Sequence, residues 1–256
     1  MREPGAPRRF RRGASILPSL FTTGNLFLGF WAIIKTFHGH YEDAGPMIGV
    51  AIVLDMLDGR IARLTGTSSE FGGELDSLAD MISFGVAPAV LAYAWAFSAS
   101  IPRAGWLAAF LFVMCGALRL ARFNVQRHVV DGRYFVGMPI PAAAGQIAAT
   151  IYFIPERLTE RYQSIPVLIL LIMIAFLMVS TVRYRSFKSL DLRSRRSYIN
   201  VLGIAIIFLL IAMHPQWVLL AMATAYSLSG PMAQLAGIIR RRGEPPPGLA
   251  PGEAHS

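Results

Sequence analysis

The sequence predicts an all-α membrane protein, a polytopic helical bundle with about eight transmembrane helices. The chain of 256 residues is 54% hydrophobic and only 15% charged, with a mean hydropathy of +0.50, which is too apolar for a water-soluble domain. Several stretches also approach the roughly 20 apolar residues that a helix needs to cross a bilayer. The predicted spans are residues 17–37, 45–64, 73–97, 104–124, 138–154, 166–182, 199–213 and 216–238.

The spans differ in the polar residues that they carry. The first contains one amide, Asn25, and the fourth contains Arg119 and Arg122 in an otherwise apolar stretch. The second and third each contain acidic residues. The fifth and seventh are short, so we expect them to be tilted or partly re-entrant, and six spans are the minimum.

The placement of charge predicts the orientation in the membrane. The net charge is +9, and arginines and lysines precede the first span and follow the fourth, sixth and last spans, whereas the alternate links are acidic, mixed or nearly uncharged. By the positive-inside rule both termini are cytoplasmic, and so is the link 65–72. Basic clusters beside apolar spans favour membrane lipids, and not nucleic acid, as the partner. The single cysteine, Cys115, excludes an intrachain disulfide and a cysteine-based metal site.

Four aspartates are the main candidates for function. Asp55 and Asp58 lie near the end of the second span, and Asp76 and Asp80 near the start of the third. Residues three or four apart share a helix face, so we expect the four carboxylates to meet between two neighbouring helices. Because a charge deep in a bilayer costs about 2.5–3.5 kcal/mol on insertion scales, these residues are expected to be functional.

Carboxylate oxygens are hard ligands that suit magnesium, manganese or calcium, and without neighbouring Cys or His residues zinc is not expected. Two divalent ions would neutralise four carboxylates, and two such ions can stabilise both the attacking and the leaving oxygen of a phosphoryl transfer. The alternative is a divalent-metal transporter, which would more often show isolated acids and internal repeats. We find no internal repeat in the sequence.

Small residues accompany the acids. Gly59, Ala62 and Gly72 each lie one helical turn from an aspartate, so a nucleotide or a phosphate can approach the backbone closely there. The alternative is that small residues simply let membrane helices pack together. Because these small residues lie beside four acids, we favour the interpretation that they leave room for a nucleotide or a phosphate.

The pattern D-x2-D-G-x2-A-R-x8-G-x3-D-x3-D, from Asp55 to Asp80, resembles the signature of the CDP-alcohol phosphotransferase family. The resemblance implies an integral membrane enzyme in which an alcohol displaces CMP from a CDP-linked donor. It also implies a six-helix catalytic core, two Mg²⁺ or Mn²⁺ ions and a polar cavity that faces the cytosol. Asp55, Asp58 and Asp76 would then be metal ligands, and Asp80 a ligand as well as the catalytic general base. The donor-binding residues would be Asn25, Asp55, Asp58, Gly59, Ala62, Arg63 and Gly72.

Other segments narrow the resemblance. Residues 17–30, 73–88, 116–124, 135–144 and 178–188 resemble the membrane-embedded phosphatidylserine synthases. This implies CDP-diacylglycerol as the donor, L-serine as the acceptor, a homodimer, and a place in the inner (cytoplasmic) membrane with the active site facing the cytoplasm. Family members with a glycerol phosphate or inositol phosphate acceptor stay open as alternatives, although those acceptors would call for more phosphate-binding cations.

An amino-acid acceptor brings a carboxylate, so its site needs a cation. Arg119 and Arg122 are three residues apart and can face one cavity, and Lys188 is a further candidate. The alternative for the arginines is that they snorkel to the membrane boundary, and for Lys188 that it lies at the membrane surface. The alternative for Asn25 is that it caps a neighbouring helix, and for Arg63 that it anchors the end of its helix. Glu74 lies about 200° from Asp76 around the helix, which excludes it from the metal site.

We therefore divide the chain into four parts. Residues 1–15 are predicted to form a basic cytoplasmic arm, and residues 16–183 the catalytic core helices. Residues 184–239 would form a basic cytoplasmic loop and two C-terminal transmembrane helices. The proline-rich segment 240–256 is expected to be a disordered cytoplasmic tail.

Overall fold

The structure is a computed structural model that describes residues 8–65, 70–126, 134–185 and 197–242. Helical segments account for nearly all of these residues. Their order is α1 (Arg8–Phe37), α2 (Tyr41–Thr65), α3 (Glu70–Asp80), the π-helical η1 (Met81–Val86), α4 (Ala87–Ala92), the π-helical η2 (Tyr93–Phe97), α5 (Pro102–Gln126), β1 (Tyr134–Val136), α6 (Ile140–Phe153), α7 (Arg161–Val179), β2 (Arg183–Arg185), α8 (Ser197–Met213) and α9 (Pro215–Arg242). The segments from α3 to η2 follow one another without a break and form one rod.

The predicted fold class is confirmed. Among the described residues four helices are long and apolar enough to span a membrane: Ser19–Phe37 of α1, the rod Glu70–Phe97, Pro102–Val125 of α5, and α7. Helix α6 is apolar but shorter, which agrees with the short fifth span. That the remaining helices also cross the bilayer stays a prediction.

Helix α1 begins at Arg8, so it is longer than the predicted span 17–37 and extends into the segment 1–15 predicted as a basic arm. One detail departs from the predicted all-α class. The structure also contains a small antiparallel pair, β1 and β2, in which Phe135 lies opposite Tyr184. Three-residue strands have no hydrophobic periodicity to detect, and their pairing joins segments that are far apart in the sequence. The tail beyond residue 242 lies outside the described residues.

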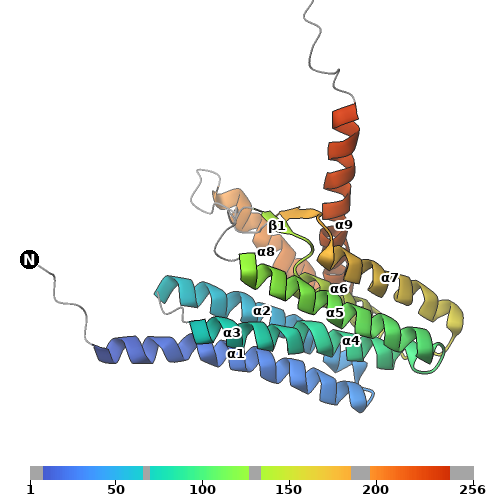
Figure 1. Cartoon of the computed structure of the whole chain (residues 1–256), viewed down its shortest axis with the longest axis horizontal. Helices are drawn as coiled ribbons and strands as arrows, with labels where there is room; N and C mark the ends of the chain where they lie inside the picture. The colour runs from blue at the N-terminus through green and yellow to red at the C-terminus, as the bar shows by residue number, and fades with distance from the viewer. Residues whose placement is uncertain (1–7, 66–69, 127–133, 186–196, 243–256) are drawn as a thin grey trace, which may run out of the picture.

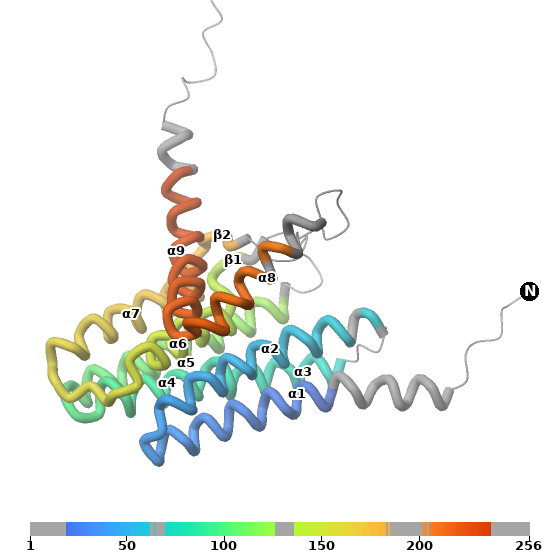
Figure 2. Tube along the Cα trace, turned by 180° about the vertical axis from the view of Figure 1, so that it is seen from behind, coloured from blue at the N-terminus to red at the C-terminus, as the bar shows by residue number. Residues whose placement is uncertain are grey.

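Figure 1 shows α1, α2, the α3–η2 rod and α5 lying lengthwise beside one another. Helix α1 packs along α2 and also contacts α3, η1 and α4. Helix α9 stands at a steep angle to these helices in both views and packs on α6, α8 and β2 (Figures 1 and 2). The end of α2, the start of α3 and the end of α5 therefore lie at the same end of the bundle.

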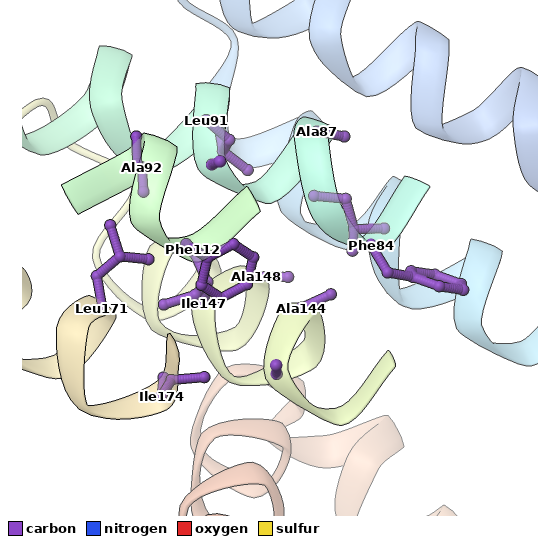
Figure 3. Close-up of a cluster of buried hydrophobic side chains, with 14 of the residues drawn as sticks. Phe84, Ala87, Leu91, Ala92, Phe112, Ala144, Ile147, Ala148, Leu171 and Ile174 are labelled. Atoms are coloured by element: carbon purple, nitrogen blue, oxygen red, sulfur yellow. The ribbon is translucent and has the colours of Figure 1, made fainter. Parts of the chain in front are cut away.

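The hydrophobic core lies between the rod, α5, α6 and α7. Phe84, Leu91, Phe112, Ile147 and Leu171 are all completely or almost completely buried, and Figure 3 shows them gathered in one cluster. Many large apolar side chains on the outer faces of the helices are exposed instead, as expected for surfaces that face lipid. The core thus fixes the rod relative to α5, α6 and α7.

At the other end of the bundle, polar contacts join neighbouring helices and the links between them. Lys35 Nζ lies 2.7 Å from Asp43 Oδ2 across the turn between α1 and α2, and this hydrogen bond lowers the pKa of the Asp43 carboxyl. The indole N–H of Trp95 donates to the carbonyl of Glu156 over 2.8 Å. These polar contacts join α1 to α2 and η2 to the link between α6 and α7.

A close contact joins α1 to the rod directly after Asp80. The Ser83 hydroxyl donates to the backbone carbonyl of Asn25 over 2.9 Å, and both residues are fully buried. Gly29 lies one turn further along α1, and a Cβ there would be only 2.6 Å from the Cα of Ser83. A glycine is therefore required at residue 29 for this approach. The first residue of η1, Met81, comes directly after Asp80. The α-helical turns that carry the acids therefore end where the π-helical turns with buried core residues begin.

We predict that Gly29→Ala destabilises the protein by about 1–3 kcal/mol, because the added methyl group meets backbone atoms that cannot move aside. Gly49→Ala is the matched control on α2, since a Cβ at residue 49 meets nothing within 4 Å. The measurement is thermal unfolding in detergent. Equal unfolding midpoints for the two variants would contradict the close approach of α1 and η1.

Candidate metal and substrate site

Three of the four predicted acids meet. Asp55 on α2 and Asp76 and Asp80 on α3 each offer a carboxylate oxygen, and these oxygens all lie within 4.8 Å of one another. Asp76 and Asp80 are four residues apart, so their directions differ by only about 40° around the helix. We call Asp55, Asp76 and Asp80 the acid triad.

Asp58 lies beside the triad and not within it. The side chain is almost fully buried, and Thr22 Oγ1 on α1 donates to Asp58 Oδ2 over 3.1 Å. Asp55 and Asp58 are three residues apart, so their directions differ by about 60°, and the second turns toward α1. Asp58 still interacts electrostatically with Asp76 and Asp55. Direct ligation of a metal by Asp58 therefore remains a prediction that the arrangement of the triad does not support.

The charges of the site are unbalanced. The carboxylate oxygens of Asp55 and Asp80 lie within 4.8 Å of each other. Two carboxylates this close repel each other unless a proton or a cation lies between them. The cationic neighbour of Asp55 and Asp80 is Arg119, which leaves an excess of negative charge. This excess favours the binding of a divalent cation.

Asn25 completes the set of oxygen donors. This side chain of α1 is fully buried, and its Nδ2 donates to Asp80 Oδ1 over 3.3 Å. Its Oδ1 is buried and has no hydrogen-bond partner among the described residues. Amide and carboxylate oxygens are the ligands that Mg²⁺, Mn²⁺ and Ca²⁺ prefer, so the residues present fit such an ion.

Arg119 and Arg122, the two candidate arginines of α5, differ in their burial. Arg119 is only 9% exposed and interacts electrostatically with Asp80, Tyr226 and Asp55. Its guanidinium lies 5.5 Å from the ring centroid of Phe123, within the range of a cation–π contact. Arg122 is exposed. The two side chains differ in direction by about 60° because they are three residues apart, and the expectation that both face one cavity stays a prediction.

The other predicted residues fall into two groups. Gly59 and Gly72 are partly buried on the helices that carry the acids, and Glu74 is exposed, which agrees with its exclusion from the site. Lys188 lies outside the described residues, and the side chains of Ala62 and Arg63 do as well. Their roles stay predictions.

The structure adds residues that the sequence analysis missed. Thr22 supports Asp58, and Ser83 binds the backbone of Asn25. Asn124 Nδ2 on α5 donates over 3.0 Å to the hydroxyl of Ser77, the neighbour of Asp76. Thr22 lies three residues before Asn25, so a search for polar residues on that face of α1 would have found it. Nothing in the local sequence indicates that Tyr226 packs against the core, because this depends on how α9 is placed.

Comparison with known proteins shows the family of the chain. The sequence profile of CDP-alcohol phosphatidyltransferases matches residues 15–229. The chain belongs to the CDP-alcohol phosphatidyltransferase family. The matched region contains the acid triad, Asn25 and Arg119, and it extends into α9.

Individual relatives are similar over most of their length. A CDP-diacylglycerol--serine O-phosphatidyltransferase of Helicobacter pylori is 37% identical over 198 residues, which are 75% of this chain and 81% of the relative. One of Bacillus subtilis is 36% identical over 172 residues, 67% of this chain and 91% of the relative. An archaetidylserine synthase of Methanothermobacter thermautotrophicus is 37% identical over 170 residues, 66% of this chain and 69% of the relative.

We predict that Asp76→Asn weakens the binding of Mn²⁺ far more than Asp58→Asn does. The first variant loses an oxygen of the triad, whereas the second alters a supporting residue, whose loss typically costs about 10–100-fold in metal affinity. Free Mn²⁺ is measured by electron paramagnetic resonance during titration of the purified protein. Glu74→Gln is the control, because this exposed acid lies on the same helix. A larger loss of affinity in Asp58→Asn than in Asp76→Asn would show that the metal is bound elsewhere.

Proposed function

We propose that this protein is a phosphatidylserine synthase, which transfers the phosphatidyl group of CDP-diacylglycerol to the hydroxyl of L-serine and releases CMP. The observation that carries this proposal is the buried Arg119 beside the triad, a cation where the acceptor needs a partner for its carboxylate. The names of the relatives from Helicobacter pylori and Bacillus subtilis support the same acceptor.

The triad, with Asn25 Oδ1, would hold Mg²⁺ or Mn²⁺, and two divalent ions would balance four carboxylates including Asp58. Bound divalent ions would neutralise the diphosphate of the donor and stabilise the negative charge of the departing CMP. The partly buried Gly59 and Gly72, with Ala62 and Arg63, would accommodate the nucleotide and the diphosphate beside these acids.

Asp80 is the proposed general base. It accepts the proton of the serine hydroxyl while the serine oxygen forms a bond to the phosphorus that carries diacylglycerol. The bond between this phosphorus and the CMP oxygen breaks, so CMP leaves and the proton remains on Asp80. Asn25 Nδ2 orients the Asp80 carboxylate by the hydrogen bond to Oδ1. A single displacement of this kind needs no covalent intermediate with the enzyme.

Arg119 would bind the serine carboxylate through its planar, two-point guanidinium. The exposed Arg122 and Lys188 are the further candidates for serine binding, and both also suit a role at the membrane surface.

The distribution of arginines supports an inner-membrane protein whose active site faces the cytoplasm. The triad lies toward the end of the bundle at which the basic arm begins, where a water-soluble acceptor can reach it. We further propose a homodimer, and a division of the chain into the basic arm, core helices 16–183, the C-terminal segment 184–239 and the tail.

The acceptor is tested by CMP release from CDP-diacylglycerol by the purified protein with Mn²⁺ or Mg²⁺. We predict release with L-serine and little release with glycerol 3-phosphate or inositol phosphate, because the described part of the site offers Arg119 as its buried cation. Preferential release with a phosphorylated acceptor would replace the proposed function by another member of the family. Metal flux into vesicles without CMP release would instead identify a transporter.

We predict that Asp80→Asn abolishes turnover and leaves the binding of CDP-diacylglycerol largely intact, because loss of a base affects the chemical step more than the ground-state contacts. Turnover is followed by CMP release, and donor binding by equilibrium dialysis of labelled CDP-diacylglycerol in detergent. Glu74→Gln is again the control and should keep full activity. Near-normal turnover in Asp80→Asn would remove this residue from the role of base.

A further inference from the structure

The hydrogen bond between Asn124 and Ser77 joins α5 to the helix that carries two acids of the triad. Asn124 Nδ2 donates to Ser77 Oγ over 3.0 Å, and both side chains are partly buried. The Ser77 hydroxyl in turn donates to the backbone carbonyl of Gly73, one turn earlier on α3, also over 3.0 Å. A hydroxyl offers one proton and two acceptor lone pairs, so it can make both bonds at once. Ser77 therefore ties α5 to the backbone of α3.

Ser77 lies between the two acids of α3. Asp76 is its direct neighbour, and Asp80 follows three residues later. Around the helix, Ser77 points about 100° from Asp76 and about 60° from Asp80. The hydroxyl therefore reaches α5, while the two carboxylates meet Asp55 of α2. The contact with α5 and the metal site use neighbouring faces of the same helical turn.

Helix α3 is held by hydrogen bonds to two other helices. At the end of α3, Asn25 of α1 donates to Asp80 over 3.3 Å. One turn earlier, Asn124 of α5 donates to Ser77. Contacts with two partners on successive turns fix both the tilt and the rotation of a helix, which a single contact does not. The bond from Asn124 is the one that lies beside Asp76.

Small rotations of α3 would disturb the acid triad. A helix with its side chains has a radius of about 5–6 Å, so a rotation of about 20° moves a carboxylate oxygen by about 2 Å. This is as long as a bond from Mg²⁺ to oxygen, about 2.0–2.1 Å. A metal ion must reach oxygens of Asp55 on α2 and of Asp76 and Asp80 on α3 at the same time. Its binding therefore depends on how α3 is turned relative to α2.

We propose that Asn124 is a positioning residue, which acts through Ser77 to hold α3 in the rotation at which Asp76 and Asp80 meet Asp55 and bind a divalent cation. This inference rests on the proposed function, because it takes the acid triad as the metal site. An interhelical bond that only stabilised the bundle would raise the thermal stability and leave the metal affinity of the folded protein unchanged. The metal affinity of folded variants therefore separates the two roles.

The test is titration of the purified full-length protein with Mn²⁺, with free Mn²⁺ followed by electron paramagnetic resonance. We expect Asn124→Ala and Ser77→Ala each to weaken Mn²⁺ binding about tenfold, the lower end of the range for residues that orient metal ligands. Asn124→Leu keeps the volume of the side chain without its hydrogen bonds, and it replaces Asn124→Ala if that variant is unstable in detergent.

Ser100→Ala is the matched control. It also removes a hydroxyl that joins two segments, since Ser100 Oγ lies 2.6 Å from Ser164 Oγ of α7, but it does so at the other end of the bundle. We expect its Mn²⁺ affinity to differ less than twofold from that of the parent protein. Thermal unfolding of each variant shows that the protein under titration is folded.

A double-mutant cycle tests whether the two residues act through their shared bond. If they do, Ser77→Ala should weaken Mn²⁺ binding less than twofold further in an Asn124→Ala background. Parent-like Mn²⁺ affinity in either folded single variant, or multiplicative losses in the double variant, would overturn the inference while Mn²⁺ binding by the parent protein upholds the metal site. Absence of Mn²⁺ binding by the parent protein would instead refute the metal site of the proposed function.

Discussion

The contact between α1 and the turn that follows Asp80 is the interaction on which the site depends. Asn25 binds Asp80 with its side chain and Ser83 with its backbone carbonyl, and Gly29 lets the two helices approach closely enough for both bonds. On the same helix, Thr22 binds Asp58 of α2. Helix α1 carries none of the acids, yet it fixes both helices that do.

This arrangement explains how buried negative charges can favour the binding of a cation. Carboxylates that meet in an apolar bundle repel one another, and Arg119 offsets only part of their charge. The carboxylate oxygens of the triad lie within 4.8 Å of one another, and the buried Asn25 Oδ1 has no hydrogen-bond partner among the described residues. A cation that joins these oxygens would remove the repulsion and would then be available to a negatively charged diphosphate. The same cation would thus both relieve the repulsion among the carboxylates and bind the diphosphate of the donor.

The sequence predicted the helical class, the approximate helix bounds and the acids that meet in the triad, because hydrophobic length and helical spacing are local properties. It did not foresee that Thr22 binds Asp58 beside the triad, or that Arg122 is exposed while Arg119 is buried. It also missed Tyr226 and the β1–β2 pair, since both depend on contacts between distant segments. Local patterns identify the residues that carry the chemistry, whereas packing decides which of them meet.

The most direct test of the account is anomalous diffraction from crystals of the protein grown with Mn²⁺ and CDP-diacylglycerol. The account predicts a manganese peak coordinated by oxygens of Asp55, Asp76 and Asp80, with the diphosphate of the donor on its open side. A donor bound without manganese between these three carboxylates, or a manganese peak at a different group of residues, would contradict it.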